Sequence, residues 1–236
     1  MRDYSKIKSL SRCPRDERSE WGDRERRFGY TASMSSNAQT GEAPSGGLHL
    51  AGSVAIVTGA SRGIGRATAA LFARVAGTFG PVDILINCAG AVANAPFERM
   101  PVADWDRVLG TNLRGTFLCC REAFRAMIPR GGGVIVNLSS LSGVRGVEKF
   151  PGLSAYTTSK FAVAGLSEIL AVEGLPHHIR VVAVSPGAVD TEMLRAAAPH
   201  LKAGMTPEEL ARILLFLVGP DARPLGGTNL EIFSNR

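Results

Sequence analysis

Val54-Ala-Ile-Val-Thr-Gly-Ala-Ser-Arg-Gly-Ile-Gly65 is the stretch that decides the fold. Its first four residues form an apolar run typical of a buried strand, and residues 66–79 place alanine and leucine at helical spacing. Between strand and helix, Gly59 permits a tight turn, Gly63 lets backbone approach a pyrophosphate, and Gly65 allows close helix–strand packing. The N-terminus of such a helix presents free N–H groups and a partial positive charge to phosphates. The stretch therefore predicts a strand–turn–helix unit that binds a pyrophosphate.

Beyond this unit, apolar strand patterns alternate with helical patterns to the end of the chain. Strands are expected at residues 82–86, 134–138, 180–184 and 228–233, and helices at residues 66–79, 105–109, 115–128, 155–172 and 207–217. Strands that alternate with helices imply a parallel sheet with helices on both faces. The predicted fold class is therefore α/β.

The composition is that of a globular protein without metal or membrane features. The 236 residues suffice for one domain with a substantial core. No apolar run approaches the roughly 20 residues of a membrane span, and residues 1–33 lack the apolar core of a signal peptide. The four cysteines have no metal-ligand spacing, so reduced structural thiols and no metal site are expected. We expect a cytoplasmic protein.

Residues 1–49 differ from the rest of the chain. Arginine and acidic residues alternate over 12–27, and residues 31–47 are rich in Ser, Gly, Ala and Pro. Such a segment buries too little apolar surface to order itself, which predicts a disordered extension before a single domain at 50–236. Met34, where the composition changes, is an alternative translation start. A nucleic-acid-binding role for the arginine-rich part is the least favoured function, because such binding usually requires a clustered basic stripe interleaved with aromatic residues.

Polar groups follow two of the predicted strands, and a Tyr–Lys pair lies in the long helix. Tyr156 and Lys160 are one helical turn apart on the same face. A neighbouring ammonium favours the phenolate and lowers the tyrosine pKa from its usual value near 10. Ser139-Ser140 and Asn87-Cys-Ala-Gly90 come at the carboxyl ends of strands, where open α/β sheets bind ligands. A hydroxyl there can hydrogen-bond a substrate carbonyl.

These segments together resemble the short-chain dehydrogenase/reductase family, and within it the 3-oxoacyl-ACP reductases. The first stretch matches the family's TGxxxGIG motif, and Asn87-Cys-Ala-Gly90, Asn112, Ser140, the YxxxK pair and Pro186-Gly187 follow in family order. The resemblance implies a Rossmann-like doubly wound parallel sheet. It also implies an NAD(P)-dependent oxidoreductase that transfers hydride between a nicotinamide and a ketone, 3-oxoacyl compound or secondary alcohol.

The resemblance assigns roles to individual residues. Tyr156 would be the general acid–base, Lys160 would lower its pKa and hold the nicotinamide ribose, Ser140 would orient the carbonyl, and Asn112 would support a proton relay. The implied cofactor-binding residues are Gly59, Ser61, Arg62, Gly63, Ile64, Gly65, Asn87, Ala89, Gly90, Tyr156, Lys160, Pro186, Gly187, Val189 and Thr191.

Cofactor choice and assembly also follow from the resemblance. Arg62 either meets a ribose 2′-phosphate or is a solvated surface charge, which leaves NADP slightly favoured over NAD. Family members commonly assemble through the long helix that carries Tyr156 and through the final strand. A homo-oligomer, dimer or tetramer, with a small carbonyl or alcohol substrate is therefore expected, and no nucleic acid or membrane partner.

The interval between Gly65 and Asn87 is much shorter than in the family. A complete member has here a helix, a strand that ends at the adenosine-ribose residue, a second helix, a third strand and a third helix. This chain has room for one helix, which predicts a sheet shortened by about two strands with a newly exposed edge. Asp83 lies at about the distance beyond the glycine turn, roughly 20 residues, at which an acidic residue binds the ribose in such folds. However, Asp83 begins a strand instead of ending one. A ribose role for Asp83 is therefore the less favoured of two interpretations.

The shortened connection also constrains the topology. About 98% of parallel crossovers are right-handed, and a right-handed connection here would move the helix to the opposite sheet face. Either the helix leaves the pyrophosphate site or the connection is left-handed. Both outcomes predict weak or absent dinucleotide binding and lowered stability, and only residues 196–199 remain to form a lid. The alternative to an active enzyme is thus a non-catalytic, truncated relative with impaired cofactor binding.

Overall fold

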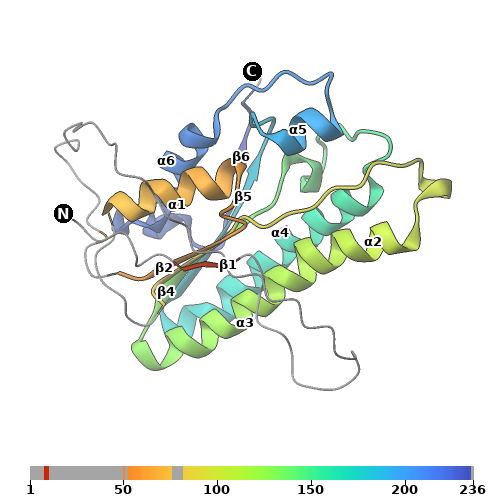
Figure 1. The fold of residues 1–236 in the computed structure, drawn as a ribbon. Helices are drawn as coiled ribbons and strands as arrows, with labels where there is room; N and C mark the ends of the chain where they lie inside the picture. Colours follow the sequence, from red (N-terminus) through yellow and green to blue (C-terminus); the bar gives the residue numbers. More distant parts are fainter. Residues whose placement is uncertain (1–7, 11–49, 51–52, 76–81, 235–236) are drawn as a thin grey trace, which may run out of the picture. The chain divides into compact units, whose positions relative to one another are not determined.

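A computed structural model of the chain describes residues 8–10, 50, 53–75 and 82–234. Within these residues, six strands form one sheet in the order β1-β2-β3-β4-β5-β6, and all neighbouring pairs are parallel (Figure 1). The strands are β1 (Lys8–Leu10), β2 (Ala55–Thr58), β3 (Ile84–Asn87), β4 (Gly133–Leu138), β5 (Ile179–Pro186) and β6 (Asn229–Ile232). The predicted α/β parallel sheet is confirmed.

Helices cover both faces of the sheet. On one face lie α1 (Gly63–Val75) and α6 (Pro207–Val218), and on the other lie α3 (Gly115–Met127) and α4 (Ser154–Gly174) (Figure 1). Within β3 the side chains alternate, since Ile86 packs in the core under α6 whereas Leu85 packs in the core under α3. Burial on both faces explains why the strands read as continuous apolar runs.

The crossover through α1 has the opposite hand to the crossovers through α3 and α4. The sheet grows in one direction from β2 to β5, yet α1 lies on the face opposite to α3 and α4. Of the two outcomes expected for the shortened connection, the chain therefore adopts the one that keeps α1 at the glycine turn. The last crossover, from β5 through α6 to β6, shares the hand of the α1 crossover.

The edge of the sheet beside β2 is covered by β1. Lys8 is paired with Ile56 and Leu10 with Thr58, so the carboxyl end of β1 is level with the start of the glycine turn. The prediction of an exposed edge is therefore wrong, because residues upstream of the predicted domain supply a strand there. Apart from residues 8–10, the N-terminal extension that was predicted to be disordered lies outside the described residues. The domain limits 50–236 stay a prediction.

Both ends of α6 are fixed by side chains. At its start Thr206 and Glu209 form a reciprocal capping box, in which each side chain accepts a hydrogen bond from the other's backbone N–H. At its end the Arg180 guanidinium of β5 donates to the last carbonyl groups, at 2.8, 3.1 and 2.9 Å. These bonds satisfy groups that helix ends leave unpaired and anchor α6 to the sheet.

The remaining predictions about the chain's general character have mixed outcomes. No helix of the described part is both long and apolar enough to cross a membrane. Cys88 and Cys120 are free thiols as expected, but Cys119 is disulfide-bonded, so the prediction of reduced cysteines is wrong for that residue.

Candidate active site

The glycine turn, residues 58–65, is too tightly packed for side chains. Gly59 and Gly63 have φ values of 68° and 52°, in the region that favours glycine. A Cβ on Gly59 would lie 2.7 Å from Ala89 Cα, and one on Gly65 would lie 2.5 Å from the Gly59 carbonyl oxygen. Because α1 begins at Gly63, its free N–H groups face this turn. The turn thus has the backbone donors that suit a pyrophosphate.

A cavity of about 580 Å³ joins the glycine turn to the carboxyl ends of β3, β4 and β5. The predicted site residues that line it are Gly59, Ser61, Arg62, Gly63, Ile64, Gly65, Ala89, Gly90, Ser140, Tyr156, Lys160, Pro186, Gly187, Val189 and Thr191. Backbone N–H groups that can donate hydrogen bonds to phosphate therefore line the same cavity as the Ser140 hydroxyl, the Tyr156 phenol and the Lys160 amine. This set of groups fits a nicotinamide dinucleotide. Among the described residues, no group of three or more His, Cys, Asp or Glu side chains could hold a metal ion.

Two predicted site residues, Asn87 and Asn112, are buried beside the cavity and do not line it. Asn87 donates to Asn137 at 2.8 Å. Asn112 lies in a π-helical segment, Gly110–Arg114, between α2 (Val102–Leu109) and α3. Its amide accepts from Ala91 N at 2.7 Å and donates to the Ala91 carbonyl and the Ser159 hydroxyl, both at 2.9 Å. Asn112 thereby fixes the loop after β3 to α4, while its role in a proton relay stays a prediction.

The two serines after β4 have different surroundings. The Ser139 hydroxyl is buried and donates to the Lys160 backbone carbonyl at 2.8 Å, which ties the end of β4 to α4. Ser140 lines the cavity and hydrogen-bonds the Tyr156 hydroxyl. The Ser140 hydroxyl, and not that of Ser139, is thus directed to Tyr156, while its role towards a substrate stays a prediction.

Tyr156 and Lys160 lie close together, but burial dominates their ionisation. The Lys160 Nζ lies 5.6 Å from the centroid of the Tyr156 ring and donates to the Leu138 carbonyl at 2.7 Å. Burial raises the pKa of Tyr156, and the hydrogen bond with Ser140 only partly opposes this effect. The prediction that Lys160 brings this pKa down is therefore wrong for the site as described. A raised pKa keeps Tyr156 protonated at neutral pH, ready to act as an acid.

Burial lowers the pKa of Lys160 to about 8, with only partial opposition from Cys88. An unfolded lysine titrates near 10.4. Between these two pH values the unfolded chain binds more protons than the folded one, so the free energy of unfolding contributed by Lys160 rises with pH across this window. Below pH 8 the folded protein carries the full penalty of a buried ammonium.

Lys160→Met should therefore stabilise the protein at neutral pH while it removes a predicted active-site residue. We expect an increase of roughly 1 to 3 kcal/mol in the free energy of unfolding at pH 7, which should shrink towards pH 10. Urea unfolding of both proteins at pH 7, 8.5 and 10 measures the difference. A difference that is independent of pH would contradict the assigned pKa.

Asp83 has a structural role at the other end of β3. Its carboxylate accepts a hydrogen bond from Val54 N at 2.8 Å and pairs with Arg130 at 3.0 Å. It lies before the first residue of β3, whereas the glycine turn lies at the carboxyl ends of the strands. The interpretation of Asp83 as a ribose ligand is therefore wrong.

The lid is larger than predicted. Helix α5 (Glu192–Ala197) follows Thr191, whose hydroxyl caps it by accepting a hydrogen bond from Leu194 N at 3.2 Å. Sequence reasoning missed the cavity-lining residues of this segment, which include Glu192, Met193, Leu194, Ala198 and Leu201, and also those between β4 and α4, such as Phe150. The N-capping threonine followed by an acidic residue is a signal that could have revealed the helix.

Comparisons with known proteins agree with this geometry. The pattern of the short chain dehydrogenase family matches residues 68–202, more than half of the chain. An acetoacetyl-CoA reductase of Rhizobium meliloti is 38% identical over 170 residues, 67% of this chain and 69% of the relative. A D-threitol dehydrogenase of Mycolicibacterium smegmatis is 36% identical over 170 residues, 67% of this chain and 64% of the relative.

Among solved structures, a 3-ketoacyl-(acyl-carrier-protein) reductase from Brucella melitensis, complexed with NADH, has a TM-score of 0.71. It is 26% identical, and the match covers 79% of this chain and 99% of that structure. By sequence, the chain spans only 62 to 69% of the length of the first curated relatives that it matches.

Proposed function

Because the chain belongs to the short-chain dehydrogenase/reductase family, we propose that it is an NAD(P)-dependent oxidoreductase that interconverts a carbonyl compound and an alcohol. One observation carries the proposal. A single cavity joins the glycine turn to Ser140, Tyr156 and Lys160, although the segment that normally separates the turn from β3 is short. The residues suited to hold phosphate and the residues suited to transfer a proton thus line the same cavity.

Residues of the chain account for the binding and proton steps. When bound, the nicotinamide supplies or accepts the hydride. The glycine turn would hold the pyrophosphate, while Ala89, Gly90 and Pro186-Gly187 would line the rest of the cofactor site.

In the reducing direction, Tyr156 donates its proton to the carbonyl oxygen, and Ser140 hydrogen-bonds the same oxygen as negative charge develops. Lys160, whose Nζ lies 5.6 Å from the centroid of the Tyr156 ring, would hold the nicotinamide ribose. In the oxidising direction the Tyr156 phenolate would take the proton back.

The proposed substrate is a 3-oxoacyl thioester or a small ketone. Support comes from the relatives named as acetoacetyl-CoA reductase and 3-ketoacyl-(acyl-carrier-protein) reductase, and from the apolar side chains of Phe150, Leu153 and Leu201 in the cavity wall. The test follows NADPH and NADH oxidation by the full chain with acetoacetyl-CoA and with a panel of ketones. Turnover above the rate without enzyme is expected, and no oxidation of either cofactor would contradict the proposal.

A homo-oligomer is part of the proposal. Large apolar side chains are exposed on the outer faces of α3 and α4, namely Phe117, Phe161, Ile169 and Val172. Their position on two adjacent helices suits a self-complementary contact between two copies. Light scattering during gel filtration would give a dimer or tetramer mass, and a monomer mass at high concentration would contradict this part.

A further inference from the structure

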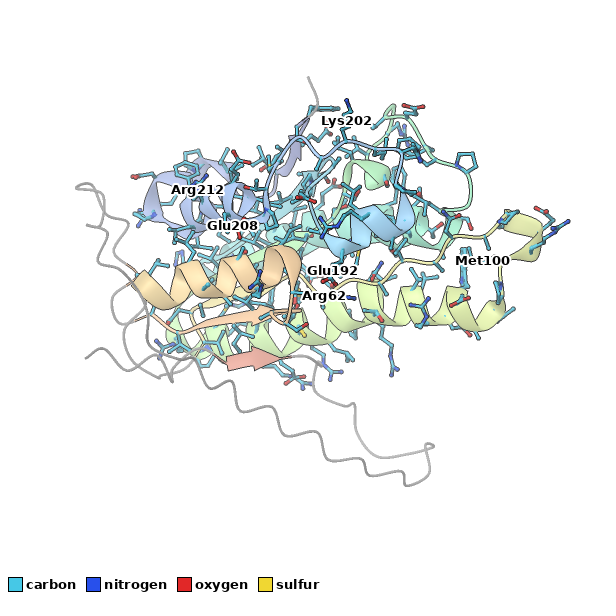
Figure 2. The ribbon with its side chains drawn as sticks, turned by 45° about the horizontal axis from the view of Figure 1, so that its top comes forward. Arg62, Met100, Glu192, Lys202, Glu208 and Arg212 are labelled. Atoms are coloured by element: carbon cyan, nitrogen blue, oxygen red, sulfur yellow. The ribbon has the colours of Figure 1, made fainter. Side chains whose placement is uncertain are left out.

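An ion pair bridges the two walls at the rim of the cavity. Arg62, in the glycine turn, approaches Glu192, the first residue of α5, with 3.2 Å between Nη1 and Oε2 (Figure 2). Both side chains are 67% exposed, so the pair faces solvent while both residues line the cavity. A ligand that reaches the rim of the cavity would therefore contact this ion pair.

The backbone beside this pair is already in close contact. A Cβ added to Gly63 would lie 3.3 Å from Thr191 Cγ2, so the residue before α5 packs against the glycine turn. Glu192 is thus held next to Arg62 by the chain itself. In contrast, Glu148, the other acidic residue of the cavity lining, lies in the segment between β4 and α4.

The cationic side chains of the cavity lining are Arg62 and Lys160, and they have different environments. Lys160 is buried and bonded to the Leu138 carbonyl at the inner end. Arg62 lies on the turn suited to the pyrophosphate, and the 2′-phosphate of NADP is carried by the ribose next to that pyrophosphate. A guanidinium can bind such a phosphate through two parallel hydrogen bonds. Arg62 is therefore the cation available to this group.

We propose that Glu192 is a specificity-determining residue, which occupies Arg62 and thereby weakens the binding of NADP relative to NAD. The inference rests on the proposed function, since it concerns the same cofactor site. A 2′-phosphate must displace the Glu192 carboxylate from Arg62 and then remains near its negative charge. Exposed ion pairs contribute little to stability, so the pair opens readily, but the repulsion persists. NAD lacks the 2′-phosphate and does not require this exchange.

The test titrates the purified full chain with NADPH and with NADH by calorimetry, for wild type and Glu192→Gln. The substitution keeps the size of the side chain and removes its charge. We expect roughly three- to tenfold tighter NADPH binding and less than a twofold change for NADH, the size expected for loss of one nearby charge. Glu148→Gln, which makes the same charge change elsewhere in the cavity lining, is the matched control and should alter the NADPH/NADH affinity ratio less than twofold.

A double-mutant cycle identifies the group through which Glu192 acts. In an Arg62→Gln background, the gain in NADPH binding from Glu192→Gln should shrink, because the carboxylate and the phosphate then have no cation to compete for and only their direct repulsion is relieved. An unchanged NADPH/NADH ratio in Glu192→Gln, or an equal gain for both cofactors, would overturn the inference and leave the proposed function intact. Failure of every variant to bind either dinucleotide would overturn both.

Discussion

Tyr156→Phe should lower kcat by about 10²- to 10⁴-fold, the usual contribution of a positioned general acid–base. The phenylalanine ring would occupy the same space at the start of α4 but could not donate a proton to the carbonyl oxygen. Because the hydroxyl group acts at the reacting carbonyl and not at the phosphates, the affinity for NADPH should change by less than about fivefold. Steady-state rates with the best substrate from the ketone panel, together with calorimetric titration, measure both quantities.

Thr158→Ala is the matched control for this change. Thr158 lies two residues further along α4 and is exposed, so its loss should leave kcat within about twofold of wild type. If Tyr156→Phe retained more than a tenth of the wild-type kcat, another group would have to supply the proton, and the assigned chemistry would be wrong.

Removal of the first 33 residues, so that the chain starts at Met34, should lower the free energy of unfolding by on the order of 2 to 4 kcal/mol. This truncation deletes β1 and leaves the edge of β2 unpaired along three residue pairs. The edge lies beside the glycine turn, so NADPH binding should weaken as well. Urea unfolding followed by circular dichroism, with a cofactor titration of the same samples, measures the two effects.

Deletion of residues 15–33 controls for the loss of chain length. It keeps β1 and leaves 20 residues between Pro14 and Val54, about 66 Å when extended, which is ample to rejoin β1 and β2. This variant should unfold like the full chain. Equal stability of the full chain and the Met34 chain would show that β1 does not contribute to the folded state.

The catalytic half of the fold could be predicted because its signals are local. The apolar runs of β3 to β5 and the helical spacing of Tyr156 and Lys160 depend on neighbouring residues only, and the structure has elements there within a few residues of the expected ends. The glycine turn could also be predicted from the sequence, because tight packing at Gly59 and Gly65 restricts these positions to glycine.

The features that sequence reasoning missed depend on contacts between distant parts of the chain. Strand β1 has three residues in a polar segment and is defined by its pairing with β2, more than 40 residues later. The Arg62–Glu192 pair joins residues 130 positions apart. Likewise, the pKa of Tyr156 depends on how deeply the fold buries it, which the spacing to Lys160 does not reveal.

The topology explains how a shortened chain can keep its site. Packing of α1 against α6 and the tight contact of Gly65 with Gly59 hold the helix at the turn. These contacts favour the less common crossover over a position on the opposite face. The shortened interval between Gly65 and Asn87 is therefore expected to weaken cofactor binding, because it lacks the family's strand that ends at the adenosine-ribose residue, while the pyrophosphate end stays formed.

The most direct test of this account is a calorimetric titration of the full chain with NADPH and NADH, with Gly65→Val as the control. Saturable binding of at least one dinucleotide is expected, with a Kd on the order of micromolar to tens of micromolar, the range common for enzyme ligands. Binding should be lost in Gly65→Val, whose Cβ would collide with the Gly59 carbonyl. A folded wild-type chain that binds neither dinucleotide up to millimolar concentration would contradict the account and identify Tyr156 and Lys160 as remnants of a lost enzyme.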